Sequence, residues 1–244
     1  MKIMPRRVLP ELLDDLRSED PRARRSRRDL HRIHRAMASV SILRHAIADL
    51  GLTGPPRSVI EIGAGDGTLL LRLALALKPR WTKVRLTLLD RQDLLASQTR
   101  EAYARLGWTV SVRCADALEW AREPATERFD LCITTLFLHH FDAGELDGLL
   151  AAVAQRSDAF VACEPRRDLL GRLGSLCVAL IGANEVTRKD AVTSVAAGFR
   201  GQELSDHWKR VTGTWGVNER HALPFTHVFS AVRTRPRAGT GHGR

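Results

Sequence analysis

Residues 58–74, SVIEIGAGDGTLLLRLA, place a β-branched run with an acid inside it and three alternating glycines directly before a leucine-rich helical pattern. A strand that runs through glycines into a helix makes a tight turn with exposed backbone N–H groups, which suits an anionic ligand. Thr68 stands where a dinucleotide-binding G-x-G-x-x-G fingerprint has its third glycine, and no Gly-Lys-Ser/Thr follows as in a P-loop. The stretch predicts a ligand-binding loop and leaves the ligand class open.

Short apolar runs alternate with helical patterns along the rest of the chain. They predict strands at 58–62, 84–90, 109–114, 129–135 and 159–163, and helices at 66–77, 92–106, 144–156 and 167–182. This alternation is typical of a parallel sheet with helices on both faces. Residues 214–232 differ, because two strands around 222–224 predict a hairpin. We therefore expect an α/β fold, in one main domain since 244 residues can bury one large core.

The net charge of +10 is carried mostly by the two ends of the chain. Residues 1–50 have 12 basic and 7 acidic side chains, and the segment from Ala231 has four arginines and no acid. Seven arginines stand within 22–35, and apolar residues three or four apart from Leu30 to Leu50 predict one helix or two in line. We interpret residues 1–55 as a helical extension docked on the body, with a lid and a basic docking surface for an acidic partner as alternatives.

The cysteines and the apolar runs indicate the cellular setting. The four cysteines form no C-x-x-C pair, which favours buried thiols in a reducing compartment over disulfides or metal ligands, so no metal site is expected. The first residues lack the apolar core of a signal peptide, and the run 174–183 is too short to span a bilayer. We expect a soluble, cytoplasmic protein with no membrane span and a disordered basic tail at 233–244.

Two acids follow neighbouring predicted strands at the edge where open α/β sheets bind ligands. Asp90 ends the second strand, and its carboxylate can accept hydrogen bonds from both hydroxyls of a ribose. Asp116 follows the third strand, where an acid or its adjacent amide can meet an adenine edge. Asp130 stands at the opposite end of the fourth strand and is expected to be structural. The glycine loop and the two acids form a set more specific than the loop alone.

The series E-I-G-A-G-D-G, Asp90, Asp116 and F-D-L-C-I-T-T-L-F-L-H-H-F resembles the class I S-adenosylmethionine-dependent methyltransferases, over residues 56–232. The resemblance implies a Rossmann-like, mostly parallel sheet of seven strands whose last strand is antiparallel. It implies the cofactor S-adenosyl-L-methionine, with S-adenosyl-L-homocysteine as the product. It also implies an insertion at about 166–205 that shapes the acceptor pocket.

By the same resemblance, a defined set of residues would surround the cofactor. The residues around its amino-acid part are Glu61, Gly63, Ala64, Gly65 and Gly67. Asp90 would lie at the ribose, with Arg91 next to it in the sequence, and Asp116 and Ala117 would lie at the adenine. Thr134 and Leu136 would lie near the methionine end.

The acceptor side is less defined by the sequence. Methyl transfer from a sulfonium is an in-line displacement that a base assists when the acceptor is a hydroxyl. His139 and His140 are the candidate bases. The alternative is that one of them packs in the core and the other caps a helix. Thr187 and Asp190 are spaced as a capping box at the start of a helix. Candidate substrate-binding residues are Glu164, Arg166, Asn184 and Glu185.

Three functions are compatible with these patterns. The first is methylation, preferably on oxygen, of a small apolar, phenolic or polyketide-like acceptor of the kind met in secondary metabolism. The second is an RNA or protein methyltransferase, suggested by the Arg-rich segment, although no aromatic N/D-P-P-Y motif follows the fourth strand. The third is a non-catalytic partner protein that keeps the fold. The oligomeric state stays open, a homodimer included.

Overall fold

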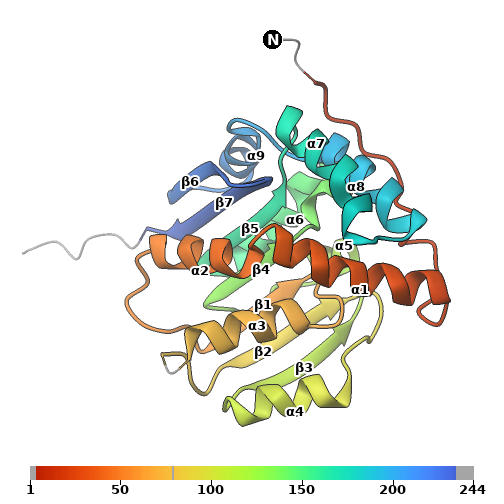
Figure 1. The fold of residues 1–244 in the computed structure, drawn as a ribbon. Helices are drawn as coiled ribbons and strands as arrows, with labels where there is room; N and C mark the ends of the chain where they lie inside the picture. The colour runs from red at the N-terminus through yellow and green to blue at the C-terminus, as the bar shows by residue number, and fades with distance from the viewer. Residues whose placement is uncertain (1–3, 79, 235–244) are drawn as a thin grey trace, which may run out of the picture.

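The computed structural model describes residues 4–78 and 80–234 (Figure 1). In these residues seven strands form one sheet in the order β3-β2-β1-β4-β5-β7-β6. The bounds are β1 Ser58–Ile62, β2 Arg85–Asp90, β3 Thr109–Cys114, β4 Leu131–Thr135, β5 Ala159–Pro165, β6 Trp215–Ala222 and β7 Thr226–Arg233. Strands β1 to β5 run parallel, and β7 is antiparallel to both of its neighbours. The predicted fold class is confirmed.

The centre of the sheet brings three strand ends together. All five residues of β1 are buried, because strands flank it on both sides and helices cover both faces. Glu61 of β1 is in register with Leu88 of β2 and Ile133 of β4, so these strands end at one edge. The chain order reverses between β1 and β4, which is the switch point where open α/β sheets bind ligands.

Helices cover both faces of the sheet (Figure 1). One face carries α2 Ser39–Asp49, α3 Thr68–Leu77 and α4 Ser97–Arg105, and the other carries α5 Ala117–Arg122, α6 Ala143–Arg156 and α9 Glu203–Val211. Val59 packs with the first group and Ile60 with the second, as the alternation of a strand requires. Each fully buried aliphatic or aromatic side chain contributes about 1.5–3 kcal/mol. The two cores therefore hold the edge of the sheet in a fixed geometry.

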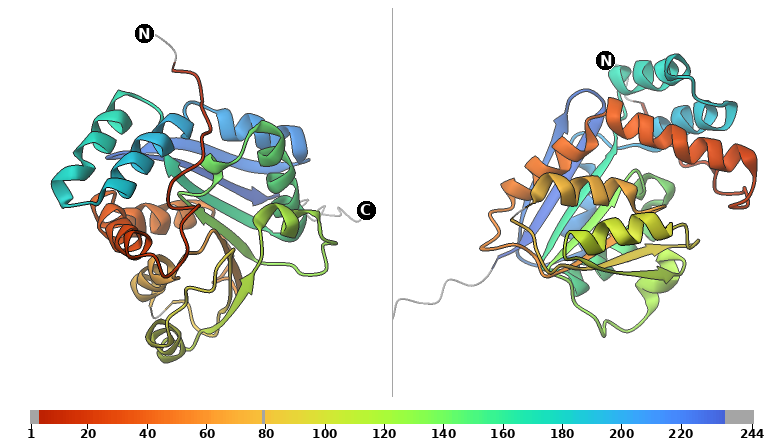
Figure 2. Two further views of the ribbon diagram at one scale, coloured as in Figure 1. Left: turned by 90° about the vertical axis from the view of Figure 1, so that its right-hand side faces the viewer. Right: turned by 60° about the horizontal axis from the view of Figure 1, so that its bottom comes forward.

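A third group of helices faces the carboxyl edge of the sheet. It consists of α1 Pro21–Ala36, α7 Leu169–Cys177 and α8 Glu185–Ala197, with short 3-10 helices η1 Leu138–His140 and η2 Val178–Ile181. Asp29 joins α1 to α8, because its Oδ2 accepts a hydrogen bond from the Asn184 N–H at 2.8 Å. Residues 4–20, which we name the strap, run alongside α8 (Figure 2), where the Arg7 N–H donates to the Ala196 carbonyl at 3.1 Å.

The strand predictions agree with the structure to within two residues, and the terminal hairpin is confirmed. The helix predicted from residue 92 begins only at Ser97, since the chain first forms a loop at the ligand edge. The capping box predicted at Thr187 is wrong. Helix α8 begins at Glu185, because the Asn184 side chain is its N-cap and accepts a hydrogen bond from the Thr187 N–H at 2.8 Å. The short helices α5 and α9 were not anticipated.

Two expectations about the ends and the thiols need correction. Arg233, which the prediction places in the disordered tail, belongs to β7, and the part of the predicted tail at 235–244 lies outside the described residues. All four cysteines are free, but only Cys132 and Cys163 are buried, whereas Cys114 and Cys177 are exposed. No helix among the described residues is long and apolar enough to cross a membrane.

Candidate active site

The loop after β1 requires glycine for both conformation and space. Gly63 and Gly67 have φ values of +72° and +70°, in the left-handed region that side chains disfavour. A Cβ on Gly63 would lie 2.2 Å from Cδ2 of Phe137, and one on Gly67 would lie 2.8 Å from Cδ1 of Leu88. The loop therefore packs directly against β2 and the segment after β4, and its backbone forms one side of a cavity.

Asp90 and Asp116 hold the backbone around this loop. Oδ2 of Asp90 accepts a hydrogen bond from the Gly65 N–H at 2.9 Å, and Oδ1 accepts one from the Gln92 N–H at 3.1 Å. Asp116 is the N-cap of α5, where Oδ1 accepts from the Leu118 N–H at 2.8 Å. A carboxylate offers about four lone-pair sites, so both acids can still accept hydrogen bonds from a ligand.

Glu61 is a buried acid on the same side of the cavity. The residue is 2% exposed, and within the described part of the chain its Oε2 has no hydrogen-bond partner. Burial, with the charges of Asp66 and Asp90, raises the pKa of Glu61 well above its usual range. An unpartnered buried carboxyl costs free energy that a cationic or hydrogen-bond-donating ligand group offsets. The residues present therefore fit the amino-acid end of the cofactor implied by the sequence.

One cavity of about 670 Å³ lies between the carboxyl edge and the covering helices. Its size is typical of a small-molecule site. One side, which we name the loop wall, has the glycine loop with Glu61, Asp90, Asp116 and their neighbours. The opposite side, the strap wall, comes from the strap, α1, α7, η2 and α8. Its apolar members are Val8, Leu9, Leu13, Leu30, Ile33, Met37, Val178, Ile181 and Val195.

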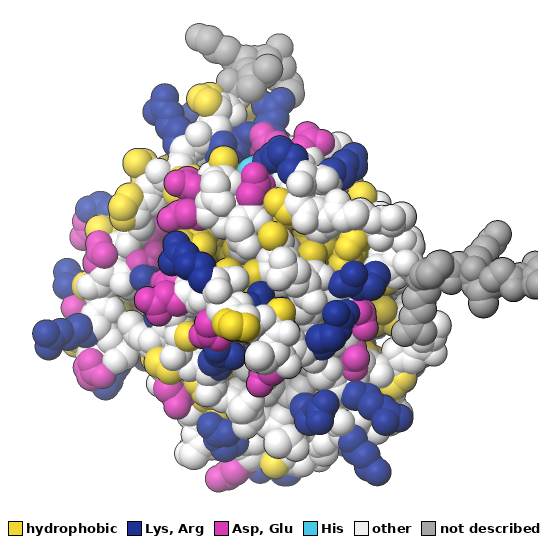
Figure 3. Space-filling view, turned by 180° about the vertical axis from the view of Figure 1, so that it is seen from behind, with side chains coloured by type: hydrophobic (Ala, Val, Ile, Leu, Met, Phe, Trp, Pro, Cys, Tyr) yellow, Lys and Arg dark blue, Asp and Glu magenta, His cyan; other side chains and the backbone are white. Residues whose placement is uncertain are grey.

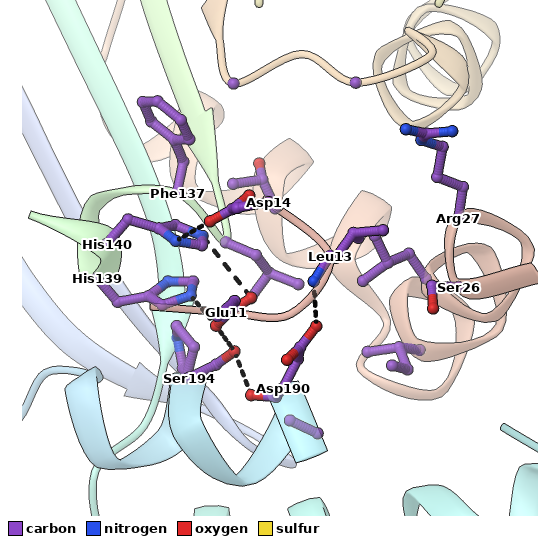
Figure 4. Close-up of a pocket in the computed structure, with 18 of the residues that line it drawn as sticks. Glu11, Leu13, Asp14, Ser26, Arg27, Phe137, His139, His140, Asp190 and Ser194 are labelled. Carbon is purple, nitrogen blue, oxygen red and sulfur yellow. Dashed lines mark hydrogen bonds and ion pairs between the residues drawn. The ribbon is translucent and has the colours of Figure 1, made fainter. Parts of the chain in front are cut away.

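His139 is the middle residue of η1, and both of its ring nitrogens are engaged. Nδ1 is 2.8 Å from Oε2 of Glu164. Nε2 is 3.2 Å from Oε1 of Glu11 (Figure 4). Burial alone would lower the pKa of His139, but the hydrogen bonds and charges of Glu11 and Glu164 outweigh it and raise the pKa to about 9. Oε1 of Glu164 in turn accepts hydrogen bonds from the Phe137 and Leu138 N–H groups. Glu164 thus fixes both the ring of His139 and the backbone after β4.

His140 is the more accessible of the two histidines, with 22% of its side chain exposed. Its Nδ1 is 3.2 Å from Oδ2 of Asp14, and its Nε2 is 4.0 Å from Oε2 of Glu11. We name Glu11, Asp14, His139, His140 and Glu164 the histidine cluster. All of its members except Glu164 line the cavity. The cluster stands where the strap meets the carboxyl end of β4 (Figure 4).

The structure brings most of the predicted cofactor set to one place. The residues that line the cavity are Glu61, Gly63, Ala64, Gly65, Asp90, Arg91, Asp116, Ala117 and Leu136. Gly67 and Thr134 do not line it. Gly67 is the N-cap of α3, and Thr134 is fully buried within β4, while the following Thr135 faces the cavity.

None of the four predicted substrate-binding residues lines the cavity. Glu164 is fully buried behind His139, and Asn184 is used as the N-cap of α8. The Glu185 side chain faces solvent and pairs with Lys189 at 2.7 Å. Arg166 pairs with Asp168 two residues on. Each of these side chains serves the fold of the segment after β5, whose apolar residues contact the cavity instead.

The sequence did not reveal the acids of the strap. Glu11 and Asp14 reach the histidines across more than a hundred residues of chain, and no local spacing marks such a pairing. Asp190 holds the strap in place, because its carboxylate accepts hydrogen bonds from the Leu12 and Leu13 N–H groups at 2.8 and 3.0 Å. Two acidic residues in an apolar stretch, Leu12 to Leu16, were the one available signal.

Comparisons with known proteins agree with this geometry. Residues 59–157 match a family model described as a methyltransferase domain. No curated protein matches the chain. Among solved structures, the plantazolicin methyltransferase BpumL in complex with SAH is 13% identical, with a TM-score of 0.62 over 88% of this chain and 92% of that one.

Two further solved structures have the same fold. An O-methyltransferase family protein from Burkholderia thailandensis is 19% identical, with a TM-score of 0.58 over 89% of this chain and 61% of that one. The magnesium protoporphyrin IX methyltransferase ChlM from Synechocystis PCC 6803, with bound SAH, is 14% identical, with a TM-score of 0.53 over 85% of this chain and 86% of that one. Strand order, family model and structural neighbours agree. Residues 59–157 of this chain are similar to a methyltransferase domain, and the chain has the fold of solved methyltransferases that bind SAH.

Proposed function

We propose that the protein transfers a methyl group from S-adenosyl-L-methionine to an oxygen atom of a small, apolar or phenolic acceptor. One observation carries the proposal: a single cavity has the loop wall on one side and an apolar strap wall on the other. A cofactor on the loop wall would place its reactive end toward Thr135, Leu136 and the histidine cluster. The bound cofactor supplies an activated methyl group, and the acceptor would occupy the apolar remainder.

The chain's own residues would bind and orient the cofactor. Glu61 would accept hydrogen bonds from the ammonium of the amino-acid part, which would partner its buried Oε2. Asp90 would accept hydrogen bonds from the ribose hydroxyls, and Asp116 or the Ala117 amide would meet the adenine. Structural neighbours crystallised with SAH support this choice of ligand.

On the acceptor side, the histidine cluster would help an acceptor hydroxyl to lose its proton. His139 is a positioning residue in this account, because carboxylates engage both of its nitrogens. Both histidines line the cavity, and His140 is the more accessible of the two. The apolar residues of the strap wall would limit the access of water to the reacting atoms and help to align the acceptor with the methyl group.

A small acceptor is favoured over RNA. The Arg-rich helix α1 uses part of its charge within the chain: Arg27 donates to Gln92 at 3.0 Å, and Arg32 pairs with Asp29 at 3.0 Å. On the face seen from behind, basic side chains are interspersed with acidic ones rather than gathered in one patch (Figure 3). The strap and α1 also line the cavity from the side opposite the loop, so an acceptor would have to fit between the two walls.

The test is methyl transfer from labelled cofactor. The full chain is incubated with methyl-labelled S-adenosyl-L-methionine and a cell extract separated into small-molecule, RNA and protein fractions. We expect label in the small-molecule fraction, on an oxygen identified by mass spectrometry. Label confined to RNA or protein would overturn the acceptor class, and no transfer to any fraction would favour the non-catalytic alternative.

A further inference from the structure

The two histidines of the cluster share one arrangement of carboxylates around their rings. Each has a carboxylate at Nδ1, Glu164 for His139 at 2.8 Å and Asp14 for His140 at 3.2 Å. Each turns Nε2 toward the same third carboxylate, that of Glu11, at 3.2 and 4.0 Å. Figure 4 shows both rings directed at Glu11 from one side of the cavity. Two Nε2 atoms and one carboxylate therefore converge on one point.

Convergence of this kind favours a positive charge at its centre. When Nδ1 of each ring donates its hydrogen to a carboxylate, Nε2 can either carry a second proton or direct its lone pair at a cation. A bound cation can therefore take the place of the ring protons between the Nε2 atoms and the carboxylate of Glu11. The surroundings supply charges of both signs. Asp14, Glu164 and Asp190 contribute further carboxylates, while Arg91 lies 3.3 Å from Asp14 and Arg6 donates to the His139 carbonyl at 3.3 Å.

We propose that Glu11, His139 and His140 bind one divalent transition-metal cation at the acceptor end of the cavity. Their ligand atoms already lie within 4.8 Å of one another. With metal–ligand bonds of about 2.0–2.2 Å, ligands around one ion stand about 3–4 Å apart, so only a small closure is needed. Two histidines and one carboxylate are the ligand set of Fe(II), Mn(II) or Zn(II) sites with open positions.

The neighbours of these ligands support a metal site. Metal-bound histidines usually donate their second N–H to a carboxylate, which fixes the ring and raises its basicity. Glu164 is fully buried and does this for His139, while its other oxygen accepts from two backbone N–H groups. Asp14 does it for His140. The cysteine pattern predicts no metal site. The site proposed here uses histidines and a carboxylate as ligands, which that pattern does not address.

The cation would deepen the proposed function, on which its role rests. Because Glu11, His139 and His140 line the cavity, an acceptor hydroxyl could bind the cation and would then release its proton to solvent more readily. The resulting oxyanion forms the new O–CH₃ bond as the S–CH₃ bond breaks, and its electron pair returns to sulfur as the neutral thioether product. The site therefore suits a phenolic or enolic hydroxyl with a second donor oxygen beside it, because such an acceptor can chelate the ion.

The experiment uses the full chain without a histidine tag, stripped with a chelator and titrated with Co²⁺. We expect one Co²⁺ per chain, with visible absorption bands of a nitrogen- and oxygen-bound ion, and displacement by Zn²⁺. Glu11→Gln and His140→Gln should each weaken binding at least about tenfold, and Glu164→Gln about 10- to 100-fold as a supporting residue. His45→Gln, an exposed histidine on α2, is the control and should leave the affinity unchanged.

The outcomes separate this proposal from the proposed function. SAH binding is measured by calorimetry on the same stripped protein. If SAH binds while Co²⁺ does not, or if Glu11→Gln and His140→Gln bind Co²⁺ like the parent chain, the metal site is refuted and the methyltransferase proposal stands. If Co²⁺ binds and SAH does not, the metal site stands and the methyltransferase proposal is refuted. Far-UV circular dichroism identifies a variant that fails to fold, and His140→Gln, at a partly exposed position, keeps the test decisive.

Discussion

The two walls of the cavity are built in different ways. The loop wall comes from consecutive βα turns, and its key bonds join nearby strand ends, such as the Gly65 N–H to Asp90. The strap wall depends on contacts across the whole chain, such as Leu12 to Asp190 and Glu11 to His139. The first wall follows from the fold of the sheet, whereas the second exists only while the strap, α8 and η1 stay together. Changes to the strap wall should therefore leave cofactor binding largely intact.

Glu164→Ala should have the largest effect on stability. The substitution leaves two backbone N–H groups and the buried His139 without their acceptor, at an expected cost of about 3–5 kcal/mol in the free energy of unfolding. Urea denaturation followed by circular dichroism measures it. Glu164→Gln keeps an acceptor oxygen and should cost clearly less. Equal stability of the alanine variant and the parent chain would refute the role assigned to this residue.

Asp190→Ala tests how the strap is held. Loss of the carboxylate removes the acceptor of the Leu12 and Leu13 N–H groups, and we expect a cost of about 1–3 kcal/mol. Hydrogen exchange at these two amides should become faster. The affinity for SAH should change less than threefold if the walls are independent. A loss of SAH affinity as large as that of a loop-wall variant would show that the two walls are not independent. Asp190→Asn is the matched conservative variant.

A smaller effect is expected from pH on the α1–α2 segment. Burial, together with the charges of His31 and Arg72, lowers the pKa of His34 from 6.5 to about 4. Because the folded-state pKa lies below that of the unfolded chain, the unfolded state binds more protons between these values. Stability should fall as the pH drops from about 6.5 toward 4, by on the order of 1 kcal/mol per pH unit.

His34→Gln should flatten this dependence, and the exposed His45→Gln should not. Denaturation at pH 7, 6 and 5 measures both variants against the parent chain. If the free energy of unfolding of His34→Gln depends on pH as steeply as that of the parent chain, groups other than His34 cause the pH dependence.

The sequence predicted the loop wall well because its signals are local. Glycines with positive φ, a β-branched run and acids at strand ends are read from neighbouring positions, and they give the strands, the switch point and most of the cofactor set. Thr134 was misplaced by one residue because alternation along β4 buries it and turns Thr135 to the cavity.

The strap wall was predicted poorly for a physical reason. Asn184 and Glu185 looked like exposed pocket residues, but capping of α8 and an i,i+4 ion pair use them. Glu164 was expected to face the acceptor, and instead it supports His139 from behind. Glu11 acquires its function only by meeting residues far along the chain, and tertiary contacts of this kind have no signature in local sequence.

The most direct test of the central claim is calorimetric titration of SAH into the parent chain and into Asp90→Ala. The account predicts one SAH per parent chain, and a weakening of about 10- to 150-fold in the variant, since hydrogen bonds to a charged group contribute about 1.5–3 kcal/mol. Glu101→Ala, an exposed acid on α4, should bind SAH like the parent chain. Equal affinity of Asp90→Ala and the parent chain, or no SAH binding at all, would contradict the account.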